Sequence, residues 1–410
     1  MSAPTTAQAS LWLDTARGLL AGADREIHRY QNLDTHLDLC MAFMEFERVL
    51  GEPFGARRAL GESFEILRAS RGLVPWLYGG AAQAGWTALT FARLARVAPP
   101  KLDTIDAVVV RWVEEYPLDH DVDLPRGVLG LGVYGLSHPS AATREKIVSG
   151  VLRTVEQRLD RAEGGAFIRL ADTPYRRGTA PTEVGHRDIG MAHGNAGLLA
   201  FLSAASTMPG QTGAGAAALQ REVFAWLRRQ RSLVPGAVFP QSVESRYRAT
   251  RSAWCYGDPG VALALFMAAD TLRPWPAEAD AARRLAVETA EAVRRRSPDR
   301  MGIHDACLCH GSAGLAYFAR RMADHADIAD GDGWRRFGSH WCADIVRRVD
   351  AGTLTYLFPP GMRTNPSFLE GDLGVALALL YAATGRRPLW EELMLTAPPS
   401  AAAETAAGPR

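Results

Sequence analysis

Apolar residues recur along this chain in two alternating helical patterns. One pattern is amphipathic, with apolar residues at three- and four-residue intervals, and it covers residues 141–159, 216–227, 277–293 and 334–349. The other is richer in apolar residues and covers 198–205, 261–270 and 315–324. We expect the amphipathic segments to be outer helices that cover the more apolar segments as inner helices.

A Gly-x-x-Gly step, or a near copy of it, occurs six times and leads into these inner segments. Its first glycines are spaced by 47, 67, 63, 54 and 60 residues and are Gly80, Gly127, Gly194, Gly257, Gly311 and Gly371. Such a period holds two helices, and glycine permits a tight turn into a helix that packs closely on neighbouring backbone. Strand signals are limited to short runs at 166–171 and 353–358. The sequence therefore predicts an all-α repeat fold.

The repeat and the composition point to one soluble domain. We expect residues 1–396 to form that domain and the Ala- and Pro-rich residues 397–410 to be a disordered tail. The net charge is +1, from 46 Lys and Arg against 45 Asp and Glu, which argues against a nucleic-acid surface. The chain shows no signal peptide and no apolar run of about 18 residues, so we expect a cytoplasmic protein. Two polar connections, at 172–191 and 358–368, either shape a substrate groove or simply cross the surface.

Residues with soft donor atoms stand directly before these glycine steps. Cys255 lies 54 positions before Cys309, and His310 follows at once. Two thiolates and one imidazole suit a zinc ion with an open fourth position, where a substrate binds. The alternative is that they are buried core residues, but their recurrence at the same place in the repeat favours metal. Cys307 is a tempting fourth ligand, which would close the site.

The surroundings of these cysteines favour the reduced thiolate form. Five cysteines are too few and too odd in number for a disulfide framework. We expect the N-termini of the helices that begin at the glycine steps to lend partial positive charge to Cys255 and Cys309.

The order of the motifs resembles that of the lanthionine synthetase C-like cyclases. The resemblance covers residues 73–380 and rests on motifs that begin near His193, Trp254, Cys309 and Ser367. These motifs read His-Gly-Asn-Ala-Gly, Trp-Cys-Tyr-Gly-Asp-Pro-Gly, Cys-His-Gly-Ser-Ala-Gly and Ser-Phe-Leu-Glu-Gly-Asp-Leu-Gly. The resemblance implies an α/α toroid of nested helical rings with one zinc ion per chain.

The same resemblance assigns roles to individual residues. The implied zinc ligands are Cys255, Cys309 and His310. The implied active-site residues are His193, Arg251, Tyr256 and Asp123, with Asp121 as a rival for Asp123. In chemical terms His193 is the candidate proton donor, oriented by Asp123, while Arg251 or Tyr256 stabilises an enolate oxygen.

The implied reaction is the cyclisation of a dehydrated precursor peptide. A cysteine thiolate of the peptide adds to dehydroalanine or dehydrobutyrine and forms lanthionine or methyllanthionine. The resemblance implies a peptide with a leader as the substrate, and a dehydratase and a transporter as partners in a biosynthetic complex. Because no kinase, lyase or dehydratase segment flanks the repeats, we expect a stand-alone cyclase.

Departures from the family pattern and competing functions remain open at this stage. The first repeat has Gln83 where the family usually has a second glycine, so its helix start is expected to pack differently. A relative that adds glutathione to dehydro residues would keep the same zinc site, and a non-catalytic scaffold is a further class. Prenyltransferase β subunits share the toroid with zinc. Glycoside hydrolases of this architecture need two carboxylates across a cleft, and no such pair accompanies the glycine steps.

Overall fold

The computed structural model describes residues 4–30, 32–70, 72–117, 120–170 and 185–399. These residues are mostly helical. They form two compact units. Unit 1 comprises Met1–Ser70, Thr250–Pro259 and Val287–Leu389, and unit 2 comprises Arg71–Ala249, Gly260–Ala286 and Trp390–Arg410.

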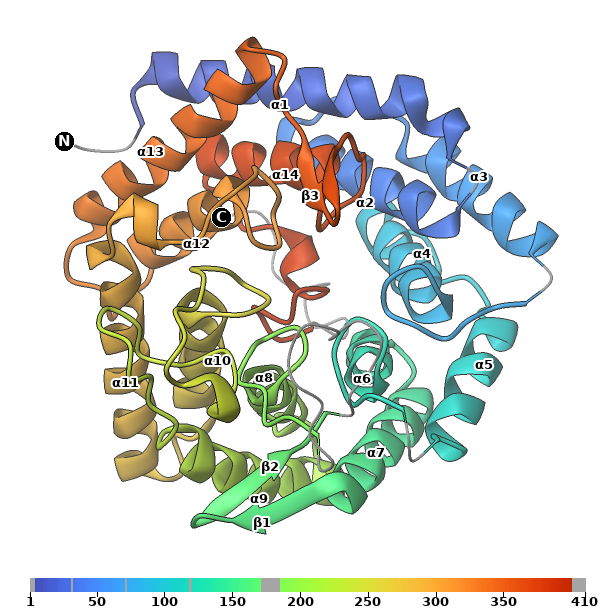
Figure 1. The fold of residues 1–410 in the computed structure, drawn as a ribbon. Helices are drawn as coiled ribbons and strands as arrows, with labels where there is room; N and C mark the ends of the chain where they lie inside the picture. The colour runs from blue at the N-terminus through green and yellow to red at the C-terminus, as the bar shows by residue number, and fades with distance from the viewer. Residues whose placement is uncertain (1–3, 31, 71, 118–119, 171–184, 400–410) are drawn as a thin grey trace. The chain divides into compact units, whose positions relative to one another are not determined.

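Unit 2 has two layers of helices. Its inner helices are α4 (Ala81–Ala95), α6 (Val128–Ser137) and α8 (Asn195–Ala205), and α6 packs against the other two. Its outer helices are α5 (Asp103–Glu114), α7 (Ala141–Arg158) and α9 (Gly210–Leu227), and α7 packs against the other two. Each outer helix covers the inner helix that precedes it in the sequence, as Figure 1 shows for α7 over α6 and α9 over α8.

Unit 1 repeats the two-layer plan with a different order of helices. Its inner helices are α2 (Leu33–Leu50), α12 (Ser312–Ala323) and α14 (Asp372–Thr384), and α14 packs against the other two. Each inner helix has one outer helix over it. Helix α1 (Thr6–Glu26) covers α14, α3 (Ala56–Ala69) covers α2, and α13 (Gly331–Asp350) covers α12. The N-terminal helix of the chain therefore covers the last inner helix (Figure 1).

Two long helices and several short elements complete the described chain. Helices α10 (Asp258–Thr271) and α11 (Pro276–Arg295) each have residues in both units. Two antiparallel hairpins are formed by β1 (Leu159–Ala162) with β2 (Gly165–Ile168), and by β3 (Tyr356–Phe358) with β4 (Gly361–Arg363). Short 3₁₀ turns are η1 (Ile27–Arg29), η3 (Val243–Ser245), η4 (Pro298–Arg300) and η5 (Leu389–Glu391).

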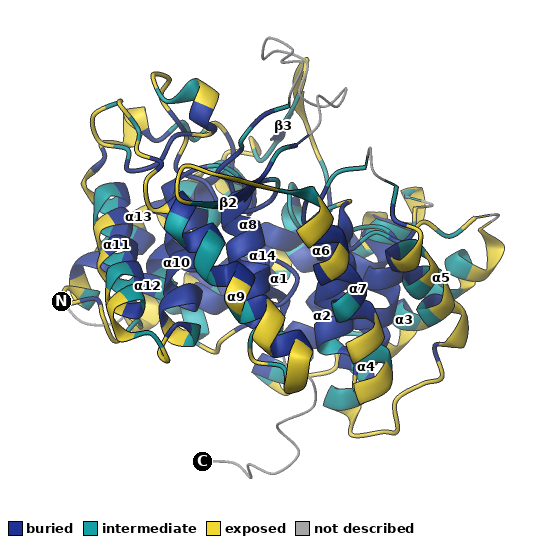
Figure 2. Ribbon diagram, turned by 90° about the horizontal axis from the view of Figure 1, so that it is seen from below, coloured by how far each residue is buried: buried dark blue, intermediate teal, exposed yellow. Residues whose placement is uncertain are grey.

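Burial separates the inner helices from the outer ones. Every residue of α8 is buried, and α6 is buried from Val128 to Leu136. The outer helix α1 instead buries one stripe, formed by Trp12, Ala16, Leu20 and Ala23. Figure 2 shows the same contrast between buried α8 and the partly exposed surface of α9. The inner and outer assignments expected from the apolar patterns are confirmed.

The six predicted inner helices begin directly after the six predicted glycines. The second glycine of the step is required by a close backbone approach, because a Cβ there would meet the carbonyl oxygen six residues earlier at 1.8 to 2.4 Å. This holds for Gly130, Gly197, Gly314 and Gly374. In α4 the corresponding residue is Gln83, whose side-chain oxygen accepts a hydrogen bond from Gly79 N at 2.6 Å. The first helix start is thus closed by a side chain.

Several elements differ from the sequence-based expectations. Helices α1, α2, α3 and α5 were not predicted, and α9 begins at Gly210 rather than near residue 216. The predicted strands at 166–171 and 353–358 are shorter, as β2 and β3, and each has a partner strand. Of the polar connection at 172–191, residues 172–184 lie outside the described residues, as does most of the tail. The connection at 358–368 contains β4. That residues 1–396 act as one domain stays a prediction.

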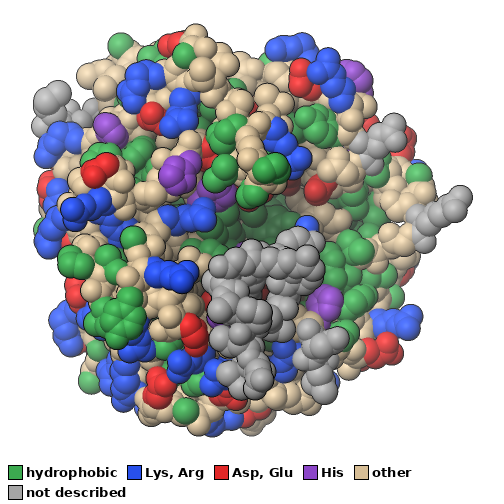
Figure 3. Space-filling model, in the orientation of Figure 1, with side chains coloured by type: hydrophobic (Ala, Val, Ile, Leu, Met, Phe, Trp, Pro, Cys, Tyr) green, Lys and Arg blue, Asp and Glu red, His purple; other side chains and the backbone are tan. Residues whose placement is uncertain are grey.

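No helix among the described residues is both long enough and apolar enough to span a bilayer. On the face drawn in Figure 3, basic and acidic side chains are interspersed.

Candidate functional site

The side chains of Cys255, Cys309 and His310 come together in unit 1. One donor atom from each lies within 4.8 Å of the other two, and both cysteines are buried. In tetrahedral zinc sites the ligand bonds are about 2.0–2.3 Å, which places donor atoms roughly 3.5 Å apart. Two sulfurs and one nitrogen at this spacing fit zinc after only small shifts, and three protein ligands leave a fourth position for a substrate.

Backbone hydrogen bonds connect the loops that carry these ligands. Cys255 lies just before α10, and Cys309 lies just before α12. Trp254 N donates to Cys309 O at 3.2 Å, and Cys309 N donates to Leu369 O at 2.9 Å. The loops that precede α10, α12 and α14 therefore support one another, which fixes the two cysteines relative to each other.

Gly257 closes the loop that carries Cys255. Its φ of +134° lies in the region that favours glycine, and a Cβ there would stand 2.0 Å from Arg251 O. The chain from Arg251 to Gly257 therefore doubles back on itself, with Cys255 in between.

The two cysteines differ in their readiness to lose a proton. A hydrogen bond from the Cys309 thiol holds the pKa of Cys255 well below its usual value; burial opposes this shift, while His310 and the positive charge of Arg251 add to it. The same hydrogen bond, together with burial, raises the pKa of Cys309. Among the protein groups alone, Cys255 is thus the thiolate of the pair.

Asp305 and Cys307 form a second group with His310 that sequence reasoning did not assign. Donor atoms of the three residues also lie within 4.8 Å of one another. His310 Nε2 lies 3.6 Å from Asp305 Oδ2, while Cys307 N and Leu357 N each donate to the Asp305 carboxylate at 2.9 Å. The signal that could have found Asp305 is an acidic residue inside a buried stretch, since a buried charge needs partners.

The electrostatics of this second group follow from those contacts. Burial acts to lower the pKa of His310, but its interactions with Asp305, Cys255 and Cys307 outweigh burial and raise that pKa to about 12. Burial acts to raise the pKa of Asp305, yet His310 and the two backbone N–H donors hold it well below its usual value. Burial raises the pKa of Cys307 to about 11, so this residue stays a thiol near neutral pH.

The influence of the α12 N-terminus on the cysteines stays a prediction, but its first N–H groups are already used in hydrogen bonds. Its first N–H groups are those of Ser312, Ala313 and Gly314. They donate to the carbonyls of Asp305, Ala306 and Cys307, at 3.1, 3.2 and 3.3 Å. Because carbonyls of the preceding loop accept these hydrogen bonds, the three N–H groups are not available to bind an anion. The positive charges that lower the pKa of Cys255 include those of His310 and Arg251.

His193 and Asp123 form a hydrogen-bonded pair in unit 2. His193 Nδ1 lies 2.7 Å from Asp123 Oδ2, and Arg126 N donates to the other carboxylate oxygen at 2.9 Å. The Asp123 side chain is 6% exposed and the His193 side chain 34%, so the aspartate is fixed while the imidazole reaches a surface. Of the two acidic candidates, Asp123 is therefore a direct partner of His193, and its functional role stays a prediction.

Arg251 and Tyr256 flank Cys255 on the same segment of unit 1. Arg251 is exposed and Tyr256 is half-buried. Glu370, which sequence reasoning did not assign, belongs to the same electrostatic neighbourhood. Burial raises the pKa of Glu370. The charge of His310 acts to lower this pKa, and the charge of Cys255 acts to raise it.

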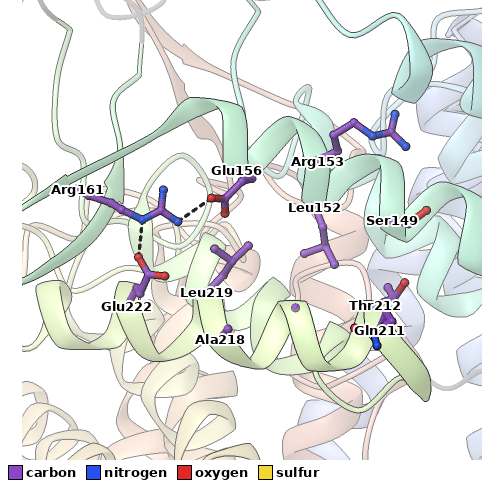
Figure 4. A pocket seen from close by; sticks show the side chains of 11 residues that line it. Ser149, Leu152, Arg153, Glu156, Arg161, Gln211, Thr212, Ala218, Leu219 and Glu222 are labelled. Carbon is purple, nitrogen blue, oxygen red and sulfur yellow. Dashed lines mark hydrogen bonds and ion pairs between the residues drawn. The ribbon is translucent and has the colours of Figure 1, made fainter.

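A separate cavity of about 520 Å³ lies in unit 2 between α7 and α9. Figure 4 shows Leu152 and Leu219 on facing helices and Arg161 bridging Glu156 and Glu222. The cavity is lined by none of the candidate site residues, so it is not the candidate site.

Comparison with known proteins agrees with the arrangement of these motifs. The family model described as lanthionine synthetase C-like protein matches residues 63–395. A search of curated proteins finds no match. Among solved structures, nisin cyclase is similar with a TM-score of 0.68 and 16% sequence identity, over 93% of this chain and 96% of that chain. This likeness confirms the predicted all-α fold of the α/α toroid class. The match over most of its length shows that the chain belongs to the lanthionine synthetase C-like family.

Proposed function

We propose that the chain is a zinc-dependent lanthipeptide cyclase that binds one zinc ion through Cys255, Cys309 and His310. The observation that carries the proposal is the meeting of these donor atoms within 4.8 Å in a member of this family. The substrate is a dehydrated precursor peptide with its leader. A cysteine of the peptide adds to a dehydro residue and closes a thioether ring.

The proposed ligands set the reactivity of the sulfur. Zinc, when bound, supplies a Lewis acid that keeps a substrate thiol in its thiolate form at neutral pH. Because Cys255 and Cys309 already contribute two negative charges, a third thiolate in the site stays electron-rich and reactive.

His193 and Asp123 are proposed to manage the proton. His193 Nδ1 faces Asp123 Oδ2 at 2.7 Å, so Nδ1 keeps a hydrogen and Nε2 is the atom that exchanges one. As the sulfur bonds to the β-carbon, the π electrons of the dehydro residue become an enolate. His193 Nε2 gives its proton to the α-carbon, and the proton lost by the substrate thiol replaces it, so the reaction is an isomerisation.

Arg251 or Tyr256 is proposed to stabilise the enolate oxygen. Both lie within the segment that carries Cys255, and the guanidinium of Arg251 is exposed. A cation and a phenol at this position provide hydrogen bonds where negative charge develops.

The test measures metal and ring closure together. Zinc per chain is determined in the purified protein, and the enzyme is given a peptide that already carries dehydro residues. We expect stoichiometric zinc, an unchanged peptide mass and a loss of thiols that react with an alkylating agent. Cys255→Ala and Cys309→Ala should lose both metal and ring closure. Cys342→Ala is the matched control, because Cys342 is also buried but lies on α13 outside both donor groups.

Other outcomes would identify the competing functions. A peptide that gains the mass of glutathione while its own cysteines stay alkylatable indicates a thiol-adding relative. Loss of water from an unmodified peptide indicates a dehydratase. Zinc without any turnover indicates a scaffold. Partnership with a dehydratase and a transporter, and a cytoplasmic location, stay predictions.

A further inference from the structure

Arg296 is a buried cation that binds one short segment at three points. It follows the end of α11, and its side chain is 5% exposed. Its Nη2 lies 2.7 Å from Asp258 Oδ2, and its Nη1 donates to Ser252 Oγ at 2.8 Å and to Thr250 O at 3.2 Å. One guanidinium thus joins both ends of residues 250–258.

The segment held in this way carries Cys255. Arg251, Cys255 and Tyr256 all lie between the first and last contacts of Arg296. The segment meets its neighbours through Ser252 N, which donates to Met301 O at 2.7 Å, and through the bond from Trp254 N to Cys309 O. Side-chain contacts at its ends and backbone contacts in its middle therefore define its shape.

The ion pair of Arg296 with Asp258 is deeply buried on both sides. Asp258 is 0% exposed and Arg296 5%, whereas Arg48 and Arg93, which also pair with buried glutamates, are 25% and 27% exposed. A buried charge is costly unless it is paired and hydrogen-bonded, so neither partner can leave alone. The planar fork of arginine also fixes direction, which a lysine ammonium does not.

We propose that Arg296 is a positioning residue that holds residues 250–258 in the shape that brings Cys255 to Cys309 and His310. The inference rests on the proposed function in one respect only, namely that Cys255 is a metal ligand. Arg296 acts through the segment, because its hydrogen bonds go to Thr250, Ser252 and Asp258. Its removal should therefore change how well and in what geometry the metal is bound.

The experiment compares metal binding by the full-length chain and its variants. Zinc affinity is measured by competition with a chelator, and cobalt(II) is substituted so that the sulfur-to-cobalt charge-transfer band reports ligation by cysteine. We expect Arg296→Met to bind zinc roughly 10- to 100-fold more weakly, the range usual for residues that support metal ligands, with a weakened or shifted band. Arg296→Lys should recover part of the affinity, and Ser252→Ala should show a smaller loss in the same direction.

A matched control separates positioning from general stability. Arg48 pairs with the buried Glu45 at 2.7 Å and donates to Arg387 O, away from the segment 250–258. Arg48→Met should lower the melting temperature and leave zinc affinity and the cobalt band unchanged.

Three results would overturn the inference. Arg296→Met with wild-type affinity and an unchanged band shows that the segment keeps its shape alone. Equal loss of affinity in Arg48→Met shows that only stability is at work. If Arg296→Met does not fold, the inference is tested with Arg296→Lys and Ser252→Ala. Wild-type metal binding in both of these variants overturns the inference. An unmodified chain that binds no zinc removes the proposed function as well, whereas normal zinc in the unmodified chain confines any failure to Arg296.

Discussion

Two histidines of this chain occupy the same place in the repeat and lie in different surroundings. His193 and His310 each stand directly before the glycine that begins an inner helix, and each faces an aspartate. His193 presents Nδ1 to Asp123 at 2.7 Å and is 34% exposed, whereas His310 presents Nε2 to Asp305 at 3.6 Å and is 13% exposed. The same helix start therefore places a histidine in two different settings, which differ in the nitrogen that faces the carboxylate and in the depth of burial.

The neighbours of each histidine complete the difference. Among the described residues, both groups that could hold a metal ion include His310, and neither includes His193. Cys255 and Cys309 supply His310 with sulfur partners, while His193 has an oxygen of Asp123 as a partner. The comparison predicts that one histidine is required to hold the metal and the other to move a proton.

The largest effect is expected from His310→Asn. Losing the one nitrogen donor of the proposed set leaves two thiolates, so zinc should be lost and ring closure should fall to the background rate. Elemental analysis and the alkylation assay measure the two losses. Zinc retained at full stoichiometry in this variant would remove the distinction between the two histidines.

A smaller effect that leaves the metal in place is expected from His193→Asn. The variant should keep its zinc and close rings on the order of 100-fold more slowly or worse, because general acid catalysis contributes that much. Single-turnover rates with a dehydrated peptide test this. Near-normal rates would transfer the proton donor to another group, with Tyr256 as the first candidate.

Asp123→Asn should cause a milder defect of the same kind. An asparagine can still accept a hydrogen bond, but the charge that stabilises an imidazolium is lost, which corresponds to about 1.5 kcal/mol or on the order of 10-fold in rate. Zinc content should not change. Asp121→Asn is the matched control, and it should keep a rate close to that of the unmodified enzyme. The opposite ranking would mean that the hydrogen bond seen at His193 is not the one used in catalysis.

The smallest effect is expected from Cys307→Ala. Cys307 belongs to the group that contains Asp305 and His310, but its pKa of about 11 keeps it protonated, and its sulfur accepts a hydrogen bond from His310 N at 3.4 Å. Zinc and ring closure should persist, with a loss of stability of about 1 kcal/mol. Thermal unfolding and metal analysis check this, and a loss of zinc would show that Cys307 closes the site as a fourth ligand.

Sequence reasoning succeeded where the chemistry repeats. The glycine steps predicted the starts of the inner helices, and at four of the steps the close approach of the second glycine to a carbonyl leaves little choice of residue. The ordered motifs also grouped Cys255, Cys309 and His310, which lie together in unit 1.

Sequence reasoning missed elements and partners that depend on tertiary contacts. Helix α2 has no glycine step, and α1 finds its partner, α14, at the opposite end of the sequence. Arg296 is the last of three consecutive arginines, and only the fold distinguishes it from Arg294, which pairs with Glu291 three residues away. The one available hint was Asp258, an acid that leads an apolar helix and needs a buried partner.

The cover that α1 gives to α14 has a consequence for synthesis on the ribosome. The apolar stripe of α1 emerges first, but the helix against which it packs ends at Thr384, about 360 residues later. At roughly 5–20 residues per second, the stripe that includes Trp12 and Leu20 waits roughly 20–70 s for its partner. During that time α1 presents a hydrophobic surface that a chaperone can bind, and its cover in unit 1 is completed only when α14 has been synthesised.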